Sequence, residues 1–258
     1  MTAALRTAGA EVFLLPLIDF EAVEEEKAVV EALERAAAGE YDWLVVSSIT
    51  TARAMLQYLG TQRLEALGNA SLKVATIGPS SRSILEELGF AVELAPEDRQ
   101  SAAGLLELWT AAGARILLPQ ADIAGTALAE GLRAAGNVVD TVTAYHTVDY
   151  PARADRRLTA DLGRPDADAS NESPEPILSP GEARSADAEG AFDVVVAASP
   201  SAARAVVDRL GSSPRARFLA IGPSTAAEAE RLGLAVAATA ATPTPHGIVD
   251  AAIAALNS

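Results

Sequence analysis

Cysteine is absent from the 258-residue chain, which excludes disulfides, thiolate zinc sites, iron–sulfur clusters and cysteine nucleophiles. Histidine is scarce. His146 and His246 are the only two, and without cysteines or an HExxH spacing they form no recognisable metal site. Each is expected to be a surface or linker histidine. Walker A, GxGxxG and GxSxG sequences are also missing, which removes support for phosphate-loop nucleotide binding and ordinary serine hydrolysis.

Long apolar runs and excess basic charge are lacking too. No stretch approaches the roughly 18 to 20 apolar residues of a membrane span, and the first ten residues contain no apolar segment of the secretory type. We therefore expect a soluble, cytoplasmic protein. With 35 acidic and 20 basic residues the net charge is −15, the wrong sign for binding nucleic acid. An anionic small molecule is compatible, because backbone N–H groups at helix N-termini bind carboxylates without Lys or Arg.

An internal duplication is the strongest positive signal. The sequence DWLVVSS from Asp42 aligns without gaps with DVVVAAS from Asp193, and IGPS at 77–80 recurs at 221–224. Each copy predicts an apolar strand, a Ser/Thr turn, a helix, a short strand, a Gly-Pro-Ser turn and a second helix. This βαβα order is typical of a parallel sheet. The predicted fold class is therefore α/β, with two similar parallel-sheet βα domains.

The duplicated turns are the candidate ligand-binding elements. Ligands of open parallel sheets bind beyond the carboxyl ends of the strands, where both kinds of turn would lie, so four turns could converge on one ligand. The alternative is that these residues only cap helices, which is their usual role and the favoured explanation for any single turn. The recurrence of both turns in the same order supports a shared role. Such a site would bind and orient a ligand, because it holds hydroxyls, glycines and backbone amides.

Between the copies, the sequence predicts a strand and turn at 115–120, a helix over about 124–135 and a strand over 138–148 that carries Tyr145. The segment 161–190 changes character, because it is rich in proline, acidic and small residues. We expect it to be a flexible insertion, a solvated loop with no function of its own.

The chain resembles the uroporphyrinogen-III synthase family, whose members close a linear tetrapyrrole in haem biosynthesis. The resemblance spans nearly the whole chain and rests on the order and spacing of motifs that are individually weak. These are strand-Ser-Ser-x-Thr-x-x-Arg at 43–53, IGPS at 77–80, Leu117-Leu118-Pro119, AYHTV at 144–148, SPSA at 199–202, IGPSTA at 221–226 and PTPHG at 243–247.

The resemblance implies two flavodoxin-like α/β domains joined by a two-stranded linker, with the ligand cleft between them. The linker strands would lie near 12–20 and 143–150. The middle domain would span 21–141, and the terminal domain would combine 1–20 with 142–258. That terminal domain would lack the first strand of the family, because the chain begins within the helix that follows it.

The implied activity is that of a cyclising hydro-lyase, which converts hydroxymethylbilane to uroporphyrinogen III with loss of water and inversion of the last pyrrole ring. No metal or organic cofactor is implied. The implied partner is this linear tetrapyrrole, with the upstream synthase that makes it as a further candidate, and we expect a monomer.

The same resemblance assigns the site residues. Tyr145 would assist departure of the hydroxyl, although a tyrosine that anchors a linker strand is the alternative. Thr225 would contact the ligand with its hydroxyl; alternatively it is an ordinary first-turn helix residue. The implied substrate-binding residues are Ser47, Ser48, Gly78, Pro79, Ser80, Pro119, Gln120, Ser199, Ser201, Gly222 and Ser224.

Two departures from the family pattern favour a second hypothesis. The missing start, and Gln120 where the family often has Arg, would suit a non-catalytic relative that binds a tetrapyrrole or another small molecule. Tyr145 and both Gly-Pro-Ser turns favour the enzyme. A third hypothesis, a hinged periplasmic binding protein, would normally carry a signal peptide.

Overall fold

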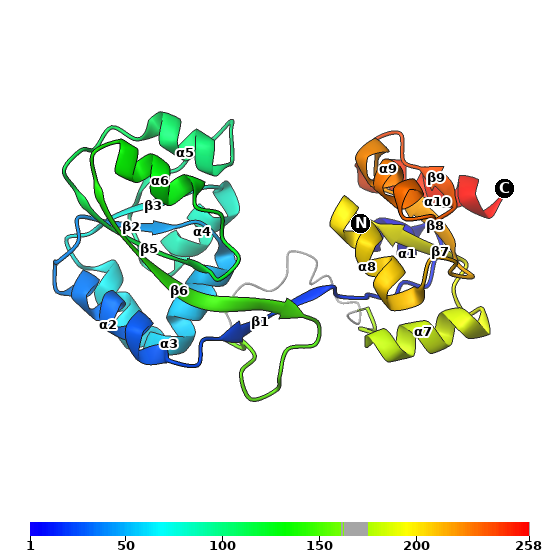
Figure 1. Cartoon of the computed structure of the whole chain (residues 1–258), viewed down its shortest axis with the longest axis horizontal. Helices are drawn as coiled ribbons and strands as arrows, with labels where there is room; N and C mark the ends of the chain where they lie inside the picture. The colour runs from blue at the N-terminus through cyan, green and yellow to red at the C-terminus, as the bar shows by residue number, and fades with distance from the viewer. Residues whose placement is uncertain (161, 163–174, 258) are drawn as a thin grey trace. The chain divides into compact units, whose positions relative to one another are not determined.

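The computed structural model describes residues 1–160, 162 and 175–257. Contacts divide the chain into two compact units (Figure 1), here called the terminal unit, Met1–Leu17 with Pro165–Ser258, and the middle unit, Ile18–Arg164. The fold class is confirmed, because each unit is an α/β structure with a parallel sheet. The unit bounds differ from the expected 1–20, 142–258 and 21–141. The main reason is that residues 142–149, which were expected in the terminal domain, belong to a strand of the middle unit's sheet.

The middle unit contains a six-stranded sheet in the order β1-β6-β5-β2-β3-β4. Five strands are parallel, and β1 runs antiparallel to β6. If the five parallel strands are numbered 1 to 5 in chain order, from β2 to β6, their spatial order is 3-2-1-4-5. Flavodoxin has the order 2-1-3-4-5, so the similarity to flavodoxin lies in the double winding. The elements are β1 Ile18–Ala22, α2 Glu26–Ala37, β2 Trp43–Val46, α3 Ile49–Gly68, β3 Lys73–Thr76, α4 Pro79–Glu87, β4 Val92–Leu94, α5 Ala102–Leu108, β5 Arg115–Ala121, α6 Ala127–Ala134 and β6 Val138–Asp149.

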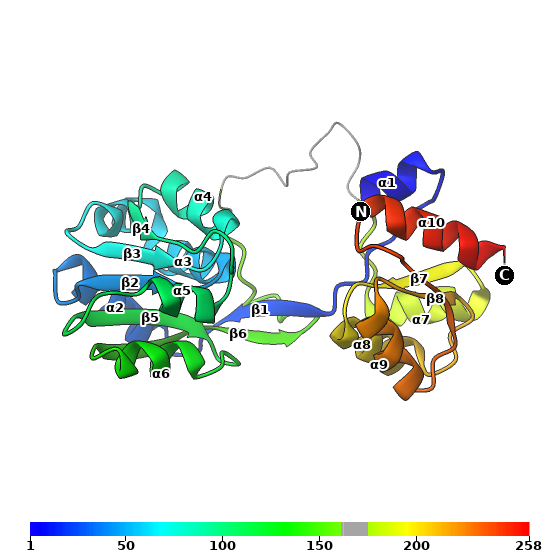
Figure 2. The same ribbon diagram turned by 90° about the horizontal axis from the view of Figure 1, so that it is seen from above.

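Helices cover both faces of this sheet (Figure 2). Alternate residues of a strand point to opposite faces, and in β2 both sets are buried. Leu44 and Val46 pack among residues of α2, α3 and α4. Trp43 and Val45 pack among residues of α5 and α6 on the other face. This burial on both faces explains why β2 is apolar throughout.

β1 and β6 form the antiparallel ladder that the resemblance implied. Ile18 pairs with Asp149 and Ala22 with Tyr145, so the paired part of the first strand is shorter than the expected 12–20. β6 runs for 12 residues, pairing first with β5 and then with β1. It therefore belongs to the sheet along its whole length.

The terminal unit contains a three-stranded parallel sheet in the order β7-β8-β9. Residues of α8 and α9 pack on one face, and residues of α1 and α10 pack on the other. The elements are α1 Thr2–Thr7, α7 Pro180–Glu189, β7 Val194–Ala197, α8 Pro200–Leu210, β8 Arg217–Ala220, α9 Pro223–Arg231, β9 Val236–Thr239 and α10 Pro245–Leu256.

Two local predictions need correction. The expected insertion at 161–190 is wrong over its last part, because α7 begins at Pro180 with a capping box between Ser179 and Glu182. Residues 161 and 163–174 lie outside the described part of the chain. The helix expected from 124 begins only at Ala127, because the residues that precede it form a turn. In the described ranges, no helix is long and apolar enough to cross a membrane.

Candidate functional site

The strand order of the middle unit reverses between β2 and β5, and open α/β sheets bind ligands at the carboxyl ends of the strands at such a point. Ser47 and Ser48 follow β2 directly, and Gly78 lies just beyond β3. The predicted residues of this unit therefore gather at one edge of the sheet, here called the carboxyl edge.

Pro119 and Gln120 are placed differently from the prediction. They were expected in a turn after a strand, but both lie inside β5, opposite Val142 and Thr143 of β6. Pro119 is buried and Gln120 is half-buried. A proline is tolerated here because β5 pairs with β2 only at Ile116 and Leu117, so the missing N–H interrupts no ladder on that side.

Ser48 and Tyr145 meet at the carboxyl edge, although they are 97 residues apart. Ser48 is the N-cap of α3, and its Oγ accepts the N–H of Thr51 at 3.1 Å. The same Oγ lies 3.1 Å from the Tyr145 hydroxyl. The Tyr145 ring packs edge-on against Phe20, with 5.5 Å between ring centroids, and the residue is 5% exposed. Both interpretations of Tyr145 keep support, because it anchors β6 and also brings a phenol to the Ser48 turn.

Tyr58 of α3 supports this arrangement, although no motif in the sequence points to it. Its hydroxyl donates to the carbonyl oxygen of Ala144 at 2.8 Å and accepts the N–H of Val23 at 3.0 Å. Burial raises the pKa of this phenol. Tyr58 thus fixes the backbone immediately before Tyr145. A lone tyrosine in a helix carries no sequence signal for such a role.

Asp122 and His146 form a second pair at the end of β5, which no motif in the sequence predicted. His146 Nδ1 lies 3.1 Å from Asp122 Oδ2, and Asp122 Oδ1 accepts the N–H of Thr147 at 2.9 Å. Burial alone would raise the pKa of Asp122, but the hydrogen bonds from Thr147 and His146 outweigh it and hold this pKa below its ordinary value. His146 was expected to be a surface or linker histidine; it lies in the ladder strand β6, where a carboxylate orients it.

The Gly-Pro-Ser turns have the predicted local structure in both units. Gly78 and Gly222 are the N-caps of α4 and α9, with proline at the first helical position. Ser80 and Ser224 are exposed. Each helix start therefore leaves backbone N–H groups and a serine hydroxyl at the carboxyl ends of the strands.

The other predicted residues of the terminal unit lie at the ends of β7 and β8. Ser199 caps α8 by accepting the N–H of Ala202 at 3.1 Å, and its Oγ lies 2.9 Å from that of Ser201. Thr225 is 1% exposed, and its buried Oγ1 finds no hydrogen-bond partner among the described residues. An unsatisfied buried hydroxyl costs free energy; a ligand contact for Thr225 stays a prediction, beside the alternative of an ordinary helix residue.

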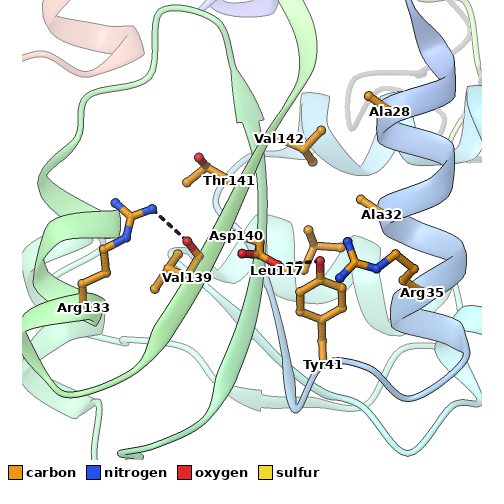
Figure 3. Close-up of a pocket in the computed structure, with 10 residues that line it drawn as sticks. All are labelled: Ala28, Ala32, Arg35, Tyr41, Leu117, Arg133, Val139, Asp140, Thr141 and Val142. Carbon is orange, nitrogen blue, oxygen red and sulfur yellow. Dashed lines mark hydrogen bonds between the residues drawn. The ribbon is translucent and has the colours of Figure 1, made fainter.

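A pocket of about 510 Å³ is lined by none of these candidate site residues (Figure 3). It is built over the first part of β6, and Tyr41 and Asp140 are among its lining residues. The Tyr41 hydroxyl donates to Asp140 at 2.9 Å, and the Arg35 and Arg115 guanidiniums lie 5.2 and 5.0 Å from the Tyr41 ring centroid. These charges compensate one another, because Arg35 also pairs with Glu40, and Arg115 with Asp140. No three His, Asp or Glu side chains gather as metal ligands in the described residues.

Comparison with protein families shows which family the chain belongs to. The family model described as "Uroporphyrinogen-III synthase HemD" matches residues 1–250. The chain belongs to this family. The resemblance inferred from the motifs is therefore confirmed.

Two curated relatives carry names from the same pathway. The porphyrin biosynthesis protein HemD of Ruminiclostridium josui is 27% identical over 55% of this chain, a stretch that spans 28% of that protein. The uroporphyrinogen-III synthase of Synechococcus elongatus is 27% identical over 56% of this chain and 54% of its own length. The matched stretches thus span about half or less of these relatives.

Solved structures of uroporphyrinogen III synthases share the fold. A mutant enzyme from Thermus thermophilus aligns over 99% of this chain and 93% of its own, with 17% identity and a TM-score of 0.52. The enzyme from Helicobacter pylori aligns over 92% and 90%, with 14% identity and a TM-score of 0.53. These likenesses support the two-unit α/β architecture.

Proposed function

We propose that the chain is a uroporphyrinogen-III synthase, a cyclising hydro-lyase that converts hydroxymethylbilane to uroporphyrinogen III. Membership of the family supports the reaction class. The observation that carries the proposal is the contact between Ser48 and Tyr145 at the carboxyl edge. It brings two residues implied by the family resemblance together at the place where this fold binds ligands.

The main task of the protein would be to hold a flexible linear tetrapyrrole in one folded conformation. Loss of the substrate hydroxyl generates an electron-rich azafulvene by the chemistry of the substrate itself. The protein then determines which pyrrole carbon attacks, and it does so by positioning and by preorganised dipoles.

The substrate carboxylates would bind at the helix starts. N-terminal N–H groups of α4 and α9 favour anions through their orientation and the helix dipole. The serines and glycines at 47–48, 78–80, 199–201 and 222–224 would supply these contacts in the two units. Gln120 of β5 can contribute hydrogen bonds to a carboxylate but no positive charge.

Tyr145 would donate a hydrogen bond to the departing hydroxyl, and Ser48 would hold the phenol in place. Thr225 would offer its unused hydroxyl to the ligand, which would relieve the cost of leaving that group without a partner.

A turnover experiment separates the enzyme from a relative that only binds tetrapyrroles. Hydroxymethylbilane is supplied in tenfold excess over the protein, and both its disappearance and the product isomer are followed. An enzyme converts many equivalents to the type III isomer. Protection of at most one equivalent, with the remainder closing spontaneously to type I, would support the binding protein and reject the synthase.

A further inference from the structure

The pair formed by Asp122 and His146 has the geometry of an oriented proton-transfer group. Both Asp122 oxygens are engaged, one by Thr147 N–H and the other by His146 Nδ1. Because Asp122 is held in its ionised form, it accepts from Nδ1, so the proton of neutral His146 resides on Nδ1. Nε2 is then the nitrogen left to exchange a proton, and the His146 side chain is 39% exposed.

The pair lies at the carboxyl edge, next to the residues already assigned to the site. Ala121 of β5 pairs with Tyr145 of β6. Asp122 directly follows Ala121, and His146 directly follows Tyr145. Successive strand side chains alternate between faces. Tyr145 with Ser48 and His146 with Asp122 therefore flank the end of β5 from opposite faces of the sheet.

Ile123 adds a surface beside this pair. It follows Asp122 directly and is 70% exposed, and it lies on a turn at the carboxyl edge. An apolar side chain beside an oriented imidazole suits a ligand that combines flat apolar rings with groups that exchange protons.

The charges around His146 come from three segments. Glu21 of β1 lies opposite it in the ladder, and Glu24 lies near enough to feel its charge. Arg153 pairs with both carboxylates, and Arg156 pairs with Glu24. With Asp122, the cluster holds three acidic groups and two arginines, so one negative charge is left over and a protonated His146 brings the cluster to neutrality.

Stability does not explain the pair. Exposed ion pairs contribute only about 0–1 kcal/mol, and the His146 side chain makes no other hydrogen bond among the described residues. The ion pair itself therefore adds little to the stability of the fold, and its geometry is suited to chemistry.

We propose that His146, oriented by Asp122, is the proton-transfer residue of the cyclisation, which rests on the proposed synthase function. The substrate hydroxyl takes a proton from solvent as the carbon–oxygen bond breaks. The pyrrole nitrogen lone pair forms the azafulvene, and water leaves. After ring closure, Nε2 of neutral His146 accepts the proton that the intermediate loses as it regains pyrrole aromaticity, and His146 then releases this proton to solvent. One water is lost, the histidine ends as it began, and no oxidant or reductant is required.

Three variants of the full chain test this proposal. His146→Gln removes the exchanging nitrogen. Asp122→Asn keeps an oxygen for Thr147 N–H but can no longer accept from Nδ1–H. His246→Gln is the matched control, because His246 lies in the first turn of α10, in the terminal unit. Steady-state kcat, KM and the pH dependence of kcat are measured, together with the ratio of type III to type I product.

The expected result is a fall of kcat by about 10²-fold or more for His146→Gln, the usual contribution of a general acid or base, with KM within about threefold. In Asp122→Asn the limb of the kcat profile that reports the base should move to lower pH, because a protonated histidine loses its carboxylate. An unchanged kcat and pH profile in His146→Gln, with an active wild type, would overturn the proton-transfer role and leave the synthase function standing. An inactive wild type would reject both.

Imidazole nitrogen NMR checks the orientation without substrate. The chain has two histidines, so His246→Gln leaves the signals of His146 alone. We expect neutral His146 to carry its proton on Nδ1 in the wild type and to lose this preference in Asp122→Asn. A proton on Nε2 in the neutral wild-type protein would contradict the proposal.

Discussion

Ser48 serves two neighbours with one oxygen, because its Oγ caps α3 at Thr51 and also contacts the Tyr145 hydroxyl. A helix start and a phenol from a distant strand thus share one polar atom. A buried tyrosine hydroxyl needs a hydrogen-bond partner whether the residue only anchors β6 or also acts in catalysis, so the contact alone does not separate the two roles. This difference between packing and chemistry can be measured at the level of single atoms.

Tyr145→Phe removes the phenol and keeps the ring that packs on Phe20. If the hydroxyl stabilises the charge that develops as the substrate hydroxyl leaves, kcat should fall about 10- to 100-fold, the equivalent of about 1.5–3 kcal/mol for one hydrogen bond to a charged group. KM should change little. Steady-state kinetics on hydroxymethylbilane make the comparison.

Tyr58→Phe is the comparison variant. It leaves the buried Ala144 carbonyl without its donor, so it should lower the free energy of unfolding by about 1–3 kcal/mol, measured with urea. If Tyr145→Phe behaved in the same way, losing stability and no turnover, Tyr145 would be an anchor only.

The residues that cap helices could be predicted from sequence, and those that meet across the sheet could not. Ser48, Ser199, Gly78 and Gly222 lie at the N-termini of helices, as the local pattern indicates. The contact of Tyr145 with Ser48 depends on strand order and on register. Neither quantity can be read from one sequence, because a shift of a single residue turns every side chain to the other face.

At the scale of elements, α8 and α9 are joined by a charged cluster. Glu228 of α9 hydrogen bonds to Arg231 and to Arg204 of α8, and these bonds lower its pKa to about 2. A carboxyl whose folded pKa is depressed contributes stability above its unfolded pKa of 4.5 and loses it as pH falls toward 2. The contact between the two helices should therefore weaken in acid.

Glu228→Gln tests this linkage. Between about pH 5 and pH 2.5, the wild type should lose more stability in the terminal unit than the variant does, because the amide of the variant does not titrate in this range. Amide exchange in α8 and α9 reports the loss locally. Parallel pH dependences in the two proteins would show that Glu228 is not linked to folding.

Gly247 of α10 is held close to another part of its unit. A Cβ at this position would lie 2.3 Å from the carbonyl oxygen of Thr242. Gly247→Ala should therefore destabilise the terminal unit by about 1–3 kcal/mol. Gly181→Ala in α7 is the control, since no atom lies within 4 Å of its Cβ. It should be neutral or stabilise by up to about 1 kcal/mol. Equal amide exchange in the two variants would contradict this account.

Element prediction succeeded where the pattern was local. The βα repeats and their turns were confirmed, whereas composition misassigned the segment from Pro180. The acidic and small residues there suggested a loop, but the capping box at Ser179 and Glu182 starts a helix. Capping chemistry was the better guide, because it reports a specific hydrogen bond, and composition reports only an average.

At the scale of the whole molecule, each unit has its own apolar core. Leu44 belongs to the core of the middle unit and Leu219 to that of the terminal unit, and both are fully buried. Both tryptophans, Trp43 and Trp109, lie in the middle unit. Their fluorescence therefore reports one unit alone.

Leu44→Ala should shift the urea transition seen by tryptophan fluorescence by about 2–5 kcal/mol. Leu219→Ala should lower amide protection within the terminal unit and leave the fluorescence transition in place. If either substitution destabilised both units equally, the two cores would not be independent.

The ratio of type III to type I product tests the central claim most directly, because hydroxymethylbilane closes to the type I isomer without an enzyme. Freshly made substrate is mixed with increasing concentrations of the chain, and the two isomers are separated after complete conversion. The account predicts that the type III fraction rises with protein concentration until type I is almost absent. Only type I product at every concentration would contradict it.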